Sequence, residues 1–419
     1  MREMKDSGLE WAGEIPLGWK TTKGKYFMSV LERPVKNDDG VITCFRDGEV
    51  TLRSNRREDG FTIATVEAGY QGIDPGDLVV HGMDGFAGAI GISDSRGKGT
   101  PALNVLDCTE NKRYIMYLLR TMAYSEVFMA LATGIRVRTC DTNWKKLREL
   151  TYLIPPMDEQ QAISEYLDRK SIEIGQFTAD IQSQIETLEQ YKRSVITEAV
   201  TRGLNPDVEM RDSEIPWVDK LPRHWDIIPS KYLFHNSDTR KRTGDVQLTA
   251  SQNWGIIPQE EYMERTGAKI VFANQGLENW KPVEPDDFVI SLRSFQGGLE
   301  MSMVTGCITW HYVVLKATRP IVPRFYKWLF KSDVYIAALQ GTCNFIRDGQ
   351  DLRYSNFSQV PLYIPPLHEQ RQIADYLDDR CSKIDEIIAE KRTQKSTLDE
   401  YKKSLIFEYV TGKKEVTMA

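Results

Sequence analysis

The chain has 419 residues, which is too long for one ordinary hydrophobic core, so we expect two to four folded units. Its 41% hydrophobic and 27% charged residues are typical of a soluble globular protein and exclude a disordered or fibrous chain. No apolar run reaches the roughly 18 residues that span a bilayer, and the first ten residues lack a signal-peptide core, so we expect the cytoplasm. The net charge of −6 counts against nucleic-acid binding unless basic residues gather locally.

The cysteines and histidines give no sign of a metal or redox centre. None of the cysteines forms the close pairs of a zinc site or a redox dithiol, and no helix carries paired histidines. We therefore expect reduced, mostly structural thiols, no metal and no cofactor. The cysteines are Cys44, Cys108, Cys140, Cys307, Cys343 and Cys381.

Each half of the chain opens with a similar entrance segment and continues into a mixed α and β body. Tryptophans on either side of a proline at a domain entrance are typical packing anchors, and we prefer this role to base stacking. In the bodies, runs such as 77–80, 287–290 and 312–315 predict short strands, and 114–134 resembles 324–341 as an amphipathic helix. The entrances align at an offset of 206 as Trp11, Pro16 and Trp19 with Trp217, Pro222 and Trp225.

An internal duplication sets the architecture. The motif Ile-Pro-Pro-Met-Asp-Glu-Gln at 154–160 returns 210 positions later as Ile-Pro-Pro-Leu-His-Glu-Gln at 364–370. The same offset then holds without a gap as far as Val-Thr at 200–201 and 410–411. The two bodies between these similar ends differ much more in sequence.

About 45 residues without proline follow each proline pair, which predicts two long helices. Apolar residues recur in them every seven positions, as a coiled-coil seam requires, and Phe177 and Tyr191 are expected to add to the first stripe. Lys391 takes the seam position aligned with Ile181. We predict that the helices pack on each other; the alternative is that each covers only its own body. The seam residues are Leu167, Ile174, Ile181, Leu188, Val195, Leu377, Ile384, Leu398 and Leu405.

This arrangement resembles the specificity subunits of type I restriction-modification enzymes over roughly Trp11 to Gly412. The resemblance implies an α+β fold with two similar mixed α/β target recognition domains, joined by two long spacer helices that pack as an antiparallel coiled coil with pseudo-two-fold symmetry. It implies recognition domains at 1–153 and 204–363, spacer helices at 154–203 and 364–412, and a tail at 413–419.

The resemblance also implies a subunit without catalytic residues that reads DNA and holds its partners together. The partners would be double-stranded DNA, adenine methyltransferase subunits, two of them by expectation, and restriction subunits. Because the bodies differ, we expect an asymmetric target in two parts, separated by an unread gap whose length the helices set. Two heads can face the same groove when they lie about one DNA turn apart.

The distribution of charge along the chain makes the negative net charge a weaker argument against nucleic-acid binding. Residues 154–203 carry a net charge of −4, whereas both bodies are nearly neutral and hold basic clusters. Arginine can contact guanine or phosphate, although any one cluster is as readily a solvated loop. The candidate DNA contacts are Arg53, Arg56, Arg57, Arg136, Arg138, Lys145, Lys146, Arg240, Lys241, Arg242, Arg293, Arg347 and Arg353.

Other functions fit the sequence less well. A methyltransferase would need an Asn-Pro-Pro-aromatic or Asp-Pro-Pro-aromatic tetrapeptide and a glycine-rich cofactor loop, and a nuclease would need clustered carboxylates. A coiled-coil scaffold with two protein-binding heads explains the duplication equally well. A specificity subunit that serves a fused restriction-methylation polypeptide also stays open.

Overall fold

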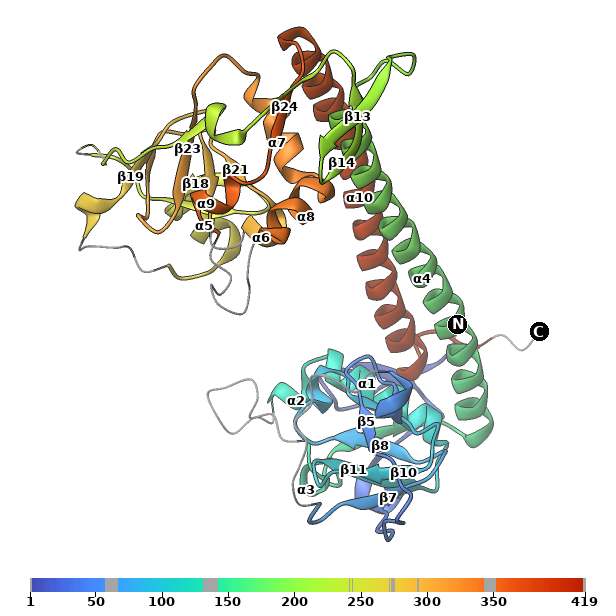
Figure 1. The fold of residues 1–419 in the computed structure, drawn as a ribbon. Helices are drawn as coiled ribbons and strands as arrows, with labels where there is room; N and C mark the ends of the chain where they lie inside the picture. Colours follow the sequence, from blue (N-terminus) through green and yellow to red (C-terminus); the bar gives the residue numbers. More distant parts are fainter. Residues whose placement is uncertain are drawn as a thin grey trace. The chain divides into compact units, whose positions relative to one another are not determined.

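The structure, a computed structural model, describes residues 2–56, 67–130, 142–240, 242, 244–270, 272, 276–291, 294–342 and 352–416. The chain forms two compact units, one made of Met1–Gln182 with Thr393–Ala419 and the other of Ser183–Arg392. Each unit holds one mixed head and a part of both long helices, α4 (Met157–Arg202) and α10 (Leu367–Val410) (Figure 1).

The first head is built around the antiparallel sheet β4-β11-β8-β9, with four two-stranded pairs beside it: β1-β2, β3-β12, β5-β6 and β7-β10. Its strands are β1 (Met4–Asp6), β2 (Glu14–Pro16), β3 (Lys20–Lys23), β4 (Met28–Val30), β5 (Ile42–Cys44), β6 (Val50–Leu52), β7 (Gln71–Ile73), β8 (Leu78–His81), β9 (Ile90–Ile92), β10 (Gly97–Gly99), β11 (Leu103–Cys108) and β12 (Thr151–Ile154). Its helices are η1 (Gly24–Tyr26), η2 (Arg53–Asn55), η3 (Gly85–Ala87), α1 (Lys112–Tyr124), α2 (Val127–Ala130) and α3 (Trp144–Leu147).

The second head repeats this topology, with the sheet β16-β23-β20-β21 and the pairs β13-β14, β15-β24, β17-β18 and β19-β22. Its strands are β13 (Met210–Ile215), β14 (Val218–Pro222), β15 (Asp226–Ile228), β16 (Phe234–Asn236), β17 (Leu248–Ser251), β18 (Gly255–Pro258), β19 (Lys281–Val283), β20 (Phe288–Ile290), β21 (Glu300–Met301), β22 (Gly306–Ile308), β23 (Val313–Ala317) and β24 (Leu362–Ile364). Its helices are η5 (Ser230–Tyr232), α5 (Gln259–Thr266), η6 (Leu277–Asn279), α6 (Ser294–Gly297), α7 (Pro323–Lys331), α8 (Asp333–Gly341) and α9 (Tyr354–Phe357).

The repeat extends to single bridges outside the strands. The parallel bridge Val41–Lys98 of the first head has its counterpart in Gln247–Cys307 of the second. The α+β fold class and the internal repeat are therefore confirmed. The predicted strands at 77–80, 287–290 and 312–315 appear as β8, β20 and β23.

The amphipathic segments are not single helices, as we expected them to be. The backbone turns at Glu126, whose φ is +58°, and this residue separates α1 from α2. In the second head, the extended Ser332 separates α7 from α8. The apolar pattern continues across both breaks because both short helices cover the same core, so periodicity alone does not reveal the break.

The entrance tryptophans are packing anchors, as predicted. Trp19 and Trp225 are both 0% exposed. The Trp19 ring meets Tyr114 edge-on, and Trp225 stacks on Tyr363 with ring centroids 5.3 Å apart. Each therefore belongs to the core of its own head.

The glutamate of the repeated motif explains why each entrance tryptophan is held in place. Glu159 accepts a hydrogen bond from Trp19 Nε1 at 2.9 Å, and Glu369 accepts one from Trp225 Nε1 at 3.0 Å. A buried indole N–H needs an acceptor, and an ionised one makes the stronger bond. The motif thus joins the first turn of each long helix to the entrance of its head.

The glutamine of the motif, fully buried in both units, fixes the start of each helix. The Gln160 amide donates to the Pro155 carbonyl at 2.9 Å and accepts from the Asn111 backbone N–H at 3.0 Å. Gln370 accepts from the Val322 backbone N–H at 2.8 Å. Since Asn111 and Val322 precede α1 and α7, the same side chain ties two helix starts together in each head.

The long helices begin at Met157 and Leu367, three residues after the motif's isoleucines, which instead end strands β12 and β24. The proline pair lies between strand and helix, as its restricted backbone requires. In the first unit Tyr166 of α4 lies 4.5 Å from Tyr409 of α10 between ring centroids. In the second unit Lys192 of α4 pairs with Asp385 of α10 at 2.6 Å. Lys395 also donates to Gln182 at 2.9 Å in the first unit, and Arg392 pairs with Glu189 at 3.0 Å in the second, so the helices run antiparallel within each unit.

The predicted seam positions differ in burial along the helices. Its outer positions are buried, and its central positions Ile181, Leu188, Lys391 and Leu398 are half-buried. Residues four positions after a seam residue complete the contact, among them the buried Ile185 and Ile388 and the half-buried lysines 192, 395 and 402. The fully or nearly fully buried seam residues are Leu167, Ile174, Val195, Leu377, Ile384 and Leu405.

Phe177 and Tyr191 were wrongly assigned to the seam, since they are 52% and 43% exposed. Each follows a seam residue by three positions. On a helix this position lies about 100° away from the position four residues after the seam, where the more buried side chains lie, and Tyr191 reaches α10 only at the edge of the contact, through a hydrogen bond from Arg380 at 2.7 Å. The two aromatic side chains therefore form a separate exposed row.

Candidate nucleic-acid interface

The predicted DNA contacts divide into those that the structure describes and those that it does not. Arg53, Arg56, Lys145, Lys146, Arg240, Arg242 and Arg353 are described. Arg57, Arg136, Arg138, Lys241, Arg293 and Arg347 lie outside the described residues.

Arg53 and Arg56 line a hollow of about 620 Å³ in the first head, which we call the arginine hollow. The hairpin β5-β6 and helix η2 form one side, and the end of strand β8 with the turn before β11 forms the other. The lining residues are Ile42, Thr43, Cys44, Phe45, Arg46, Asp47, Arg53, Arg56, His81, Asp84, Thr100 and Leu103. Three arginines thus share one concave surface with a histidine and two carboxylates.

Two of the arginines are held in different ways. Arg56 pairs with Asp47 at 2.7 Å and with Glu49 at 3.0 Å, and its guanidinium lies 4.2 Å from the centre of the Phe45 ring. Burial would raise the pKa of Asp47, but the Arg56 guanidinium and the Glu49 backbone N–H hold it below its usual value. Arg46 has one ion pair, with Asp84 at 2.8 Å, and its side chain is 61% exposed.

His81 ends strand β8 at the wall of the hollow, and its tautomer follows from its hydrogen bonds. Its Nδ1 accepts from the backbone N–H groups of Met83 at 3.2 Å and of Asp84 at 3.1 Å. Burial lowers the pKa of His81 below its usual value of 6.5, so the ring is neutral at pH 7. A neutral imidazole that accepts at Nδ1 carries its proton on Nε2. His81 therefore has a hydrogen-bond donor at Nε2.

Thr142, the first described residue after segment 131–141, lies beside His81. Its hydroxyl donates to the His81 carbonyl at 2.9 Å, and its own carbonyl accepts from the Asn104 side chain at 3.1 Å. Thr142 therefore helps to hold the end of strand β8 at the wall of the hollow.

The other described candidates do not gather at this hollow. Lys145 and Lys146 lie on α3, the first exposed and the second half-buried, and Arg240 and Arg353 are exposed. Arg242 bonds to Glu284 at 2.7 Å and lowers the pKa of that carboxyl group. Lys316 shares Glu284 at 3.1 Å, so Arg242 belongs to an ion-pair network within its own head.

Arg46 and His81 were not among the predicted DNA contacts. Both are isolated basic residues, whereas most of the predicted contacts are clustered in the sequence. One available signal was the position of His81 at the end of the apolar run Leu-Val-Val, because the candidate Arg293 lies shortly after the equivalent run in the second half. Only the fold brings the turn with Arg46 next to this strand end.

The second head carries different residues at the equivalent places. Ser291 follows β20 where His81 ends β8, and Gln259 begins α5 directly after its hairpin where Arg53 begins η2. Gln259 is only 9% exposed and donates to the Leu248 carbonyl within the head. The two heads thus share a fold but differ in the side chains at this surface.

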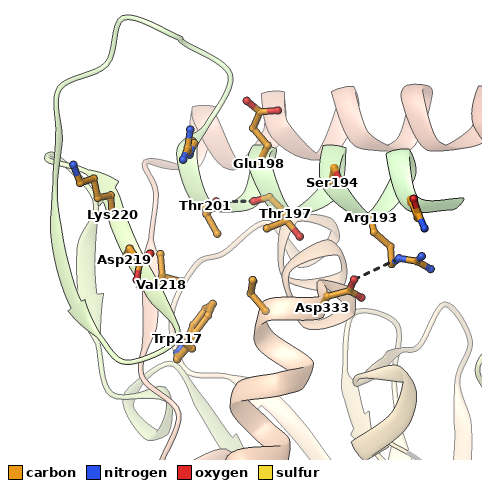
Figure 2. Close-up of a pocket in the computed structure, with 13 residues that line it drawn as sticks. Arg193, Ser194, Thr197, Glu198, Thr201, Trp217, Val218, Asp219, Lys220 and Asp333 are labelled. Atoms are coloured by element: carbon orange, nitrogen blue, oxygen red, sulfur yellow. Dashed lines mark hydrogen bonds and ion pairs between the residues drawn. The ribbon is translucent and has the colours of Figure 1, made fainter. Parts of the chain in front are cut away.

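The second unit contains another hollow, of about 830 Å³, beside the last turns of α4 (Figure 2). Figure 2 shows Arg193 and Thr197 of α4 on one side and Trp217 and Asp333 on the other. Arg193 and Asp333 approach each other to 3.5 Å. Acidic and basic side chains line this hollow in equal number, whereas basic side chains outnumber acidic ones in the arginine hollow.

Two further observations concern absences. Among the described residues, no group of three histidine, cysteine, aspartate or glutamate side chains is placed to hold a metal ion. Within the same part of the chain, no helix has both the length and the apolar character needed to cross a membrane.

The comparisons with known proteins agree with this architecture. No protein-family model matches the chain. The chain is 24% identical to a protein of Methanocaldococcus jannaschii named as the type I restriction enzyme MjaX specificity subunit, over 96% of this chain and 95% of that protein. A solved structure from work on assembly of the type I restriction-modification system matches the fold with a TM-score of 0.65 at 11% identity, covering 94% of this chain and 98% of the other. The chain is thus similar over nearly its full length to a named type I specificity subunit, and it shares its duplicated fold with a solved structure from work on such a system.

Proposed function

We propose that this chain is the sequence-reading subunit of a type I restriction-modification complex, that it recognises an asymmetric DNA site in two parts, and that it catalyses no step itself. One observation carries the proposal: the same head fold occurs twice, with different side chains at equivalent surface positions. Two heads with the same fold can each bind one half of a DNA site in the same way, and different side chains at equivalent positions allow the two heads to read different base sequences.

The arginine hollow is the surface that we assign to DNA in the first head. It gathers Arg46, Arg53 and Arg56 on a concave face, and guanidinium groups suit both phosphates and guanine edges. Asp84, 34% exposed, adds an acceptor of the kind that cytosine N4 requires. The negative net charge of the whole chain is therefore compatible with DNA binding at this surface.

We assign target recognition to residues 1–153 and 204–363, spacing to the helices within 154–203 and 364–412, and no role in reading DNA to the tail 413–419. The candidate contacts outside the arginine hollow stay part of this proposal. In particular, we assign equivalent roles to two pairs of arginines that follow corresponding amphipathic segments in the sequence. These pairs are Arg136 with Arg138 in the first half and Arg347 with Arg353 in the second.

The exposed row on the long helices is the surface that we assign to methyltransferase subunits. Phe177 and Tyr191 on α4 align with Ile387 and Tyr401 on α10, and these four side chains are 43 to 52% exposed. Apolar side chains in water favour association with a partner. Because the row occurs on both helices, we propose two methyltransferase subunits per chain, joined by restriction subunits. We place the complex in the cytoplasm with the DNA that it reads.

Co-expression with the methyltransferase of a neighbouring gene, followed by mapping of methylated adenines across the host genome, tests the proposal. The expected result is one bipartite motif with a fixed gap, and exchange of residues 15–150 for those of a relative should change only one half of it. The matched control is the methyltransferase without this chain. Methylation at the same motif in the control would refute the proposal, as would a motif whose halves both change.

A further inference from the structure

His81 is a directional hydrogen-bond donor inside the arginine hollow. The backbone N–H groups of Met83 and Asp84 occupy Nδ1 and leave the proton on Nε2. Within the described ranges, no residue accepts a hydrogen bond from Nε2. The histidine is half-buried, and its backbone carbonyl is held by Thr142 and its backbone N–H by the Ala89 carbonyl. The position of the ring is therefore set by the fold.

The chemistry of this donor suits a base better than a phosphate. Three arginines line the same hollow and supply the positive charge that phosphates attract. A neutral imidazole adds little to that attraction, but it adds a single hydrogen bond of defined direction. In the major groove each purine presents N7 as an acceptor, with a second acceptor on guanine and a donor on adenine beside it.

We propose that His81 is a specificity-determining residue that donates from Nε2 to N7 of one purine in the half-site read by the first head. The inference rests on the proposed function and deepens it, since it names an atom of the target. The equivalent position of the second head is Ser291, which is 8% exposed, so the contact belongs to one half-site only.

Two substitutions separate reading from folding. His81→Asn keeps an acceptor near the position of Nδ1 for the two backbone N–H groups but offers no donor at Nε2. His81→Gln extends far enough to return an N–H donor to about the position of Nε2. We expect His81→Asn to lose discrimination at one purine and His81→Gln to retain part of it, while both keep the unfolding temperature of the wild type. His235→Asn, at an exposed strand position of the second head, is the matched control.

The test uses the full complex with its methyltransferase and duplexes in which one purine at a time is replaced by its 7-deaza analogue, which lacks the N7 acceptor. Loss of one neutral hydrogen bond should weaken binding of the wild type about fivefold at a single position of one half-site. The His81→Asn complex should bind the natural and 7-deaza duplexes equally, whereas the His235→Asn complex should behave as the wild type does.

The outcomes separate this inference from the proposed function. A wild-type complex that methylates a bipartite motif but tolerates every 7-deaza purine in the half-site of the first head overturns the role of His81 alone. The same holds if His81→Asn keeps the full 7-deaza effect. A complex that shows no bipartite motif overturns the proposed function, and the role of His81 falls with it.

Discussion

Arg46 and Arg56 line one hollow but should respond differently to salt. Among the residues that the structure describes, Arg46 pairs only with Asp84, and its side chain is 61% exposed, so it can exchange Asp84 for a phosphate at small cost. Arg56 is 38% exposed and is held by two carboxylates and an aromatic ring. We therefore expect Arg46 to contact phosphate and Arg56 to support the hairpin that carries Arg46.

The magnitude follows from counterion release. Each phosphate contact contributes about 0.9 to the slope of log affinity against log salt on duplex DNA. Arg46→Ala should lower the slope by this amount, which means that the affinity ratio of wild type to variant shrinks about 3.5-fold between 50 and 200 mM salt. The loss should be similar for target and random duplexes, because a phosphate contact carries no sequence information.

Fluorescence anisotropy of a labelled duplex, titrated with the complex at four salt concentrations, measures both slopes. Arg56→Ala is the matched control and should lower the unfolding temperature while leaving the slope unchanged. An unchanged slope in Arg46→Ala would refute the assignment of this residue to phosphate. A slope lost in Arg56→Ala would show that its ion pairs open on binding.

Three further predictions concern the long helices. Inserting four residues after Gln182 adds about 6 Å and slightly more than one helical turn to α4, so the unread gap of the DNA target should lengthen by one or two base pairs. Mapping of methylated adenines measures the gap. An unchanged gap would show that the helices do not set its length. Burial lowers the pKa of Lys402, so its charge destabilises the fold at pH 7 and this cost disappears as the pH rises to 10.5. Lys402→Met should therefore raise the unfolding temperature at pH 7 but not near pH 10.5, and an equal gain at both values would contradict the assignment. Gly412→Ala should lower the unfolding temperature more than Gly203→Ala does, because both glycines have positive φ but only at 412 would a Cβ atom lie 2.4 Å from Pro16 Cδ. Thermal unfolding of the two variants measures the difference. Equal decreases in unfolding temperature would mean that the contact with Pro16 relaxes freely.

The sequence alone determined the features that depend on periodicity and repetition. The offset of 210 residues, the proline pairs and the seven-residue apolar stripe identified two similar halves and two long helices that pack together. These signals are local or strictly periodic, so they survive without knowledge of the fold. The burial of Trp19 and Trp225 followed from the same reasoning, since large aromatic residues at an entrance need a core.

Only the tertiary structure determines which face of each helix is buried. Phe177 and Tyr191 are spaced by a multiple of seven, but only the packing of α10 on α4 shows that they lie at its exposed edge. The break at Glu126 is invisible in a periodic pattern because α1 and α2 bury the same face. The role of Glu159 likewise depends on Trp19, which lies 140 residues away in the chain.

The candidate site was predicted least well, for the same physical reason. Arg53 and Arg56 were found because neighbouring basic residues are visible in the sequence. Arg46 and His81 were missed because their meaning depends on the turn, the strand end and the two backbone N–H groups that surround them. A repeated fold is encoded by residues that face inward and tolerate little change, whereas a recognition surface is assembled from outward side chains on loops that only folding brings together.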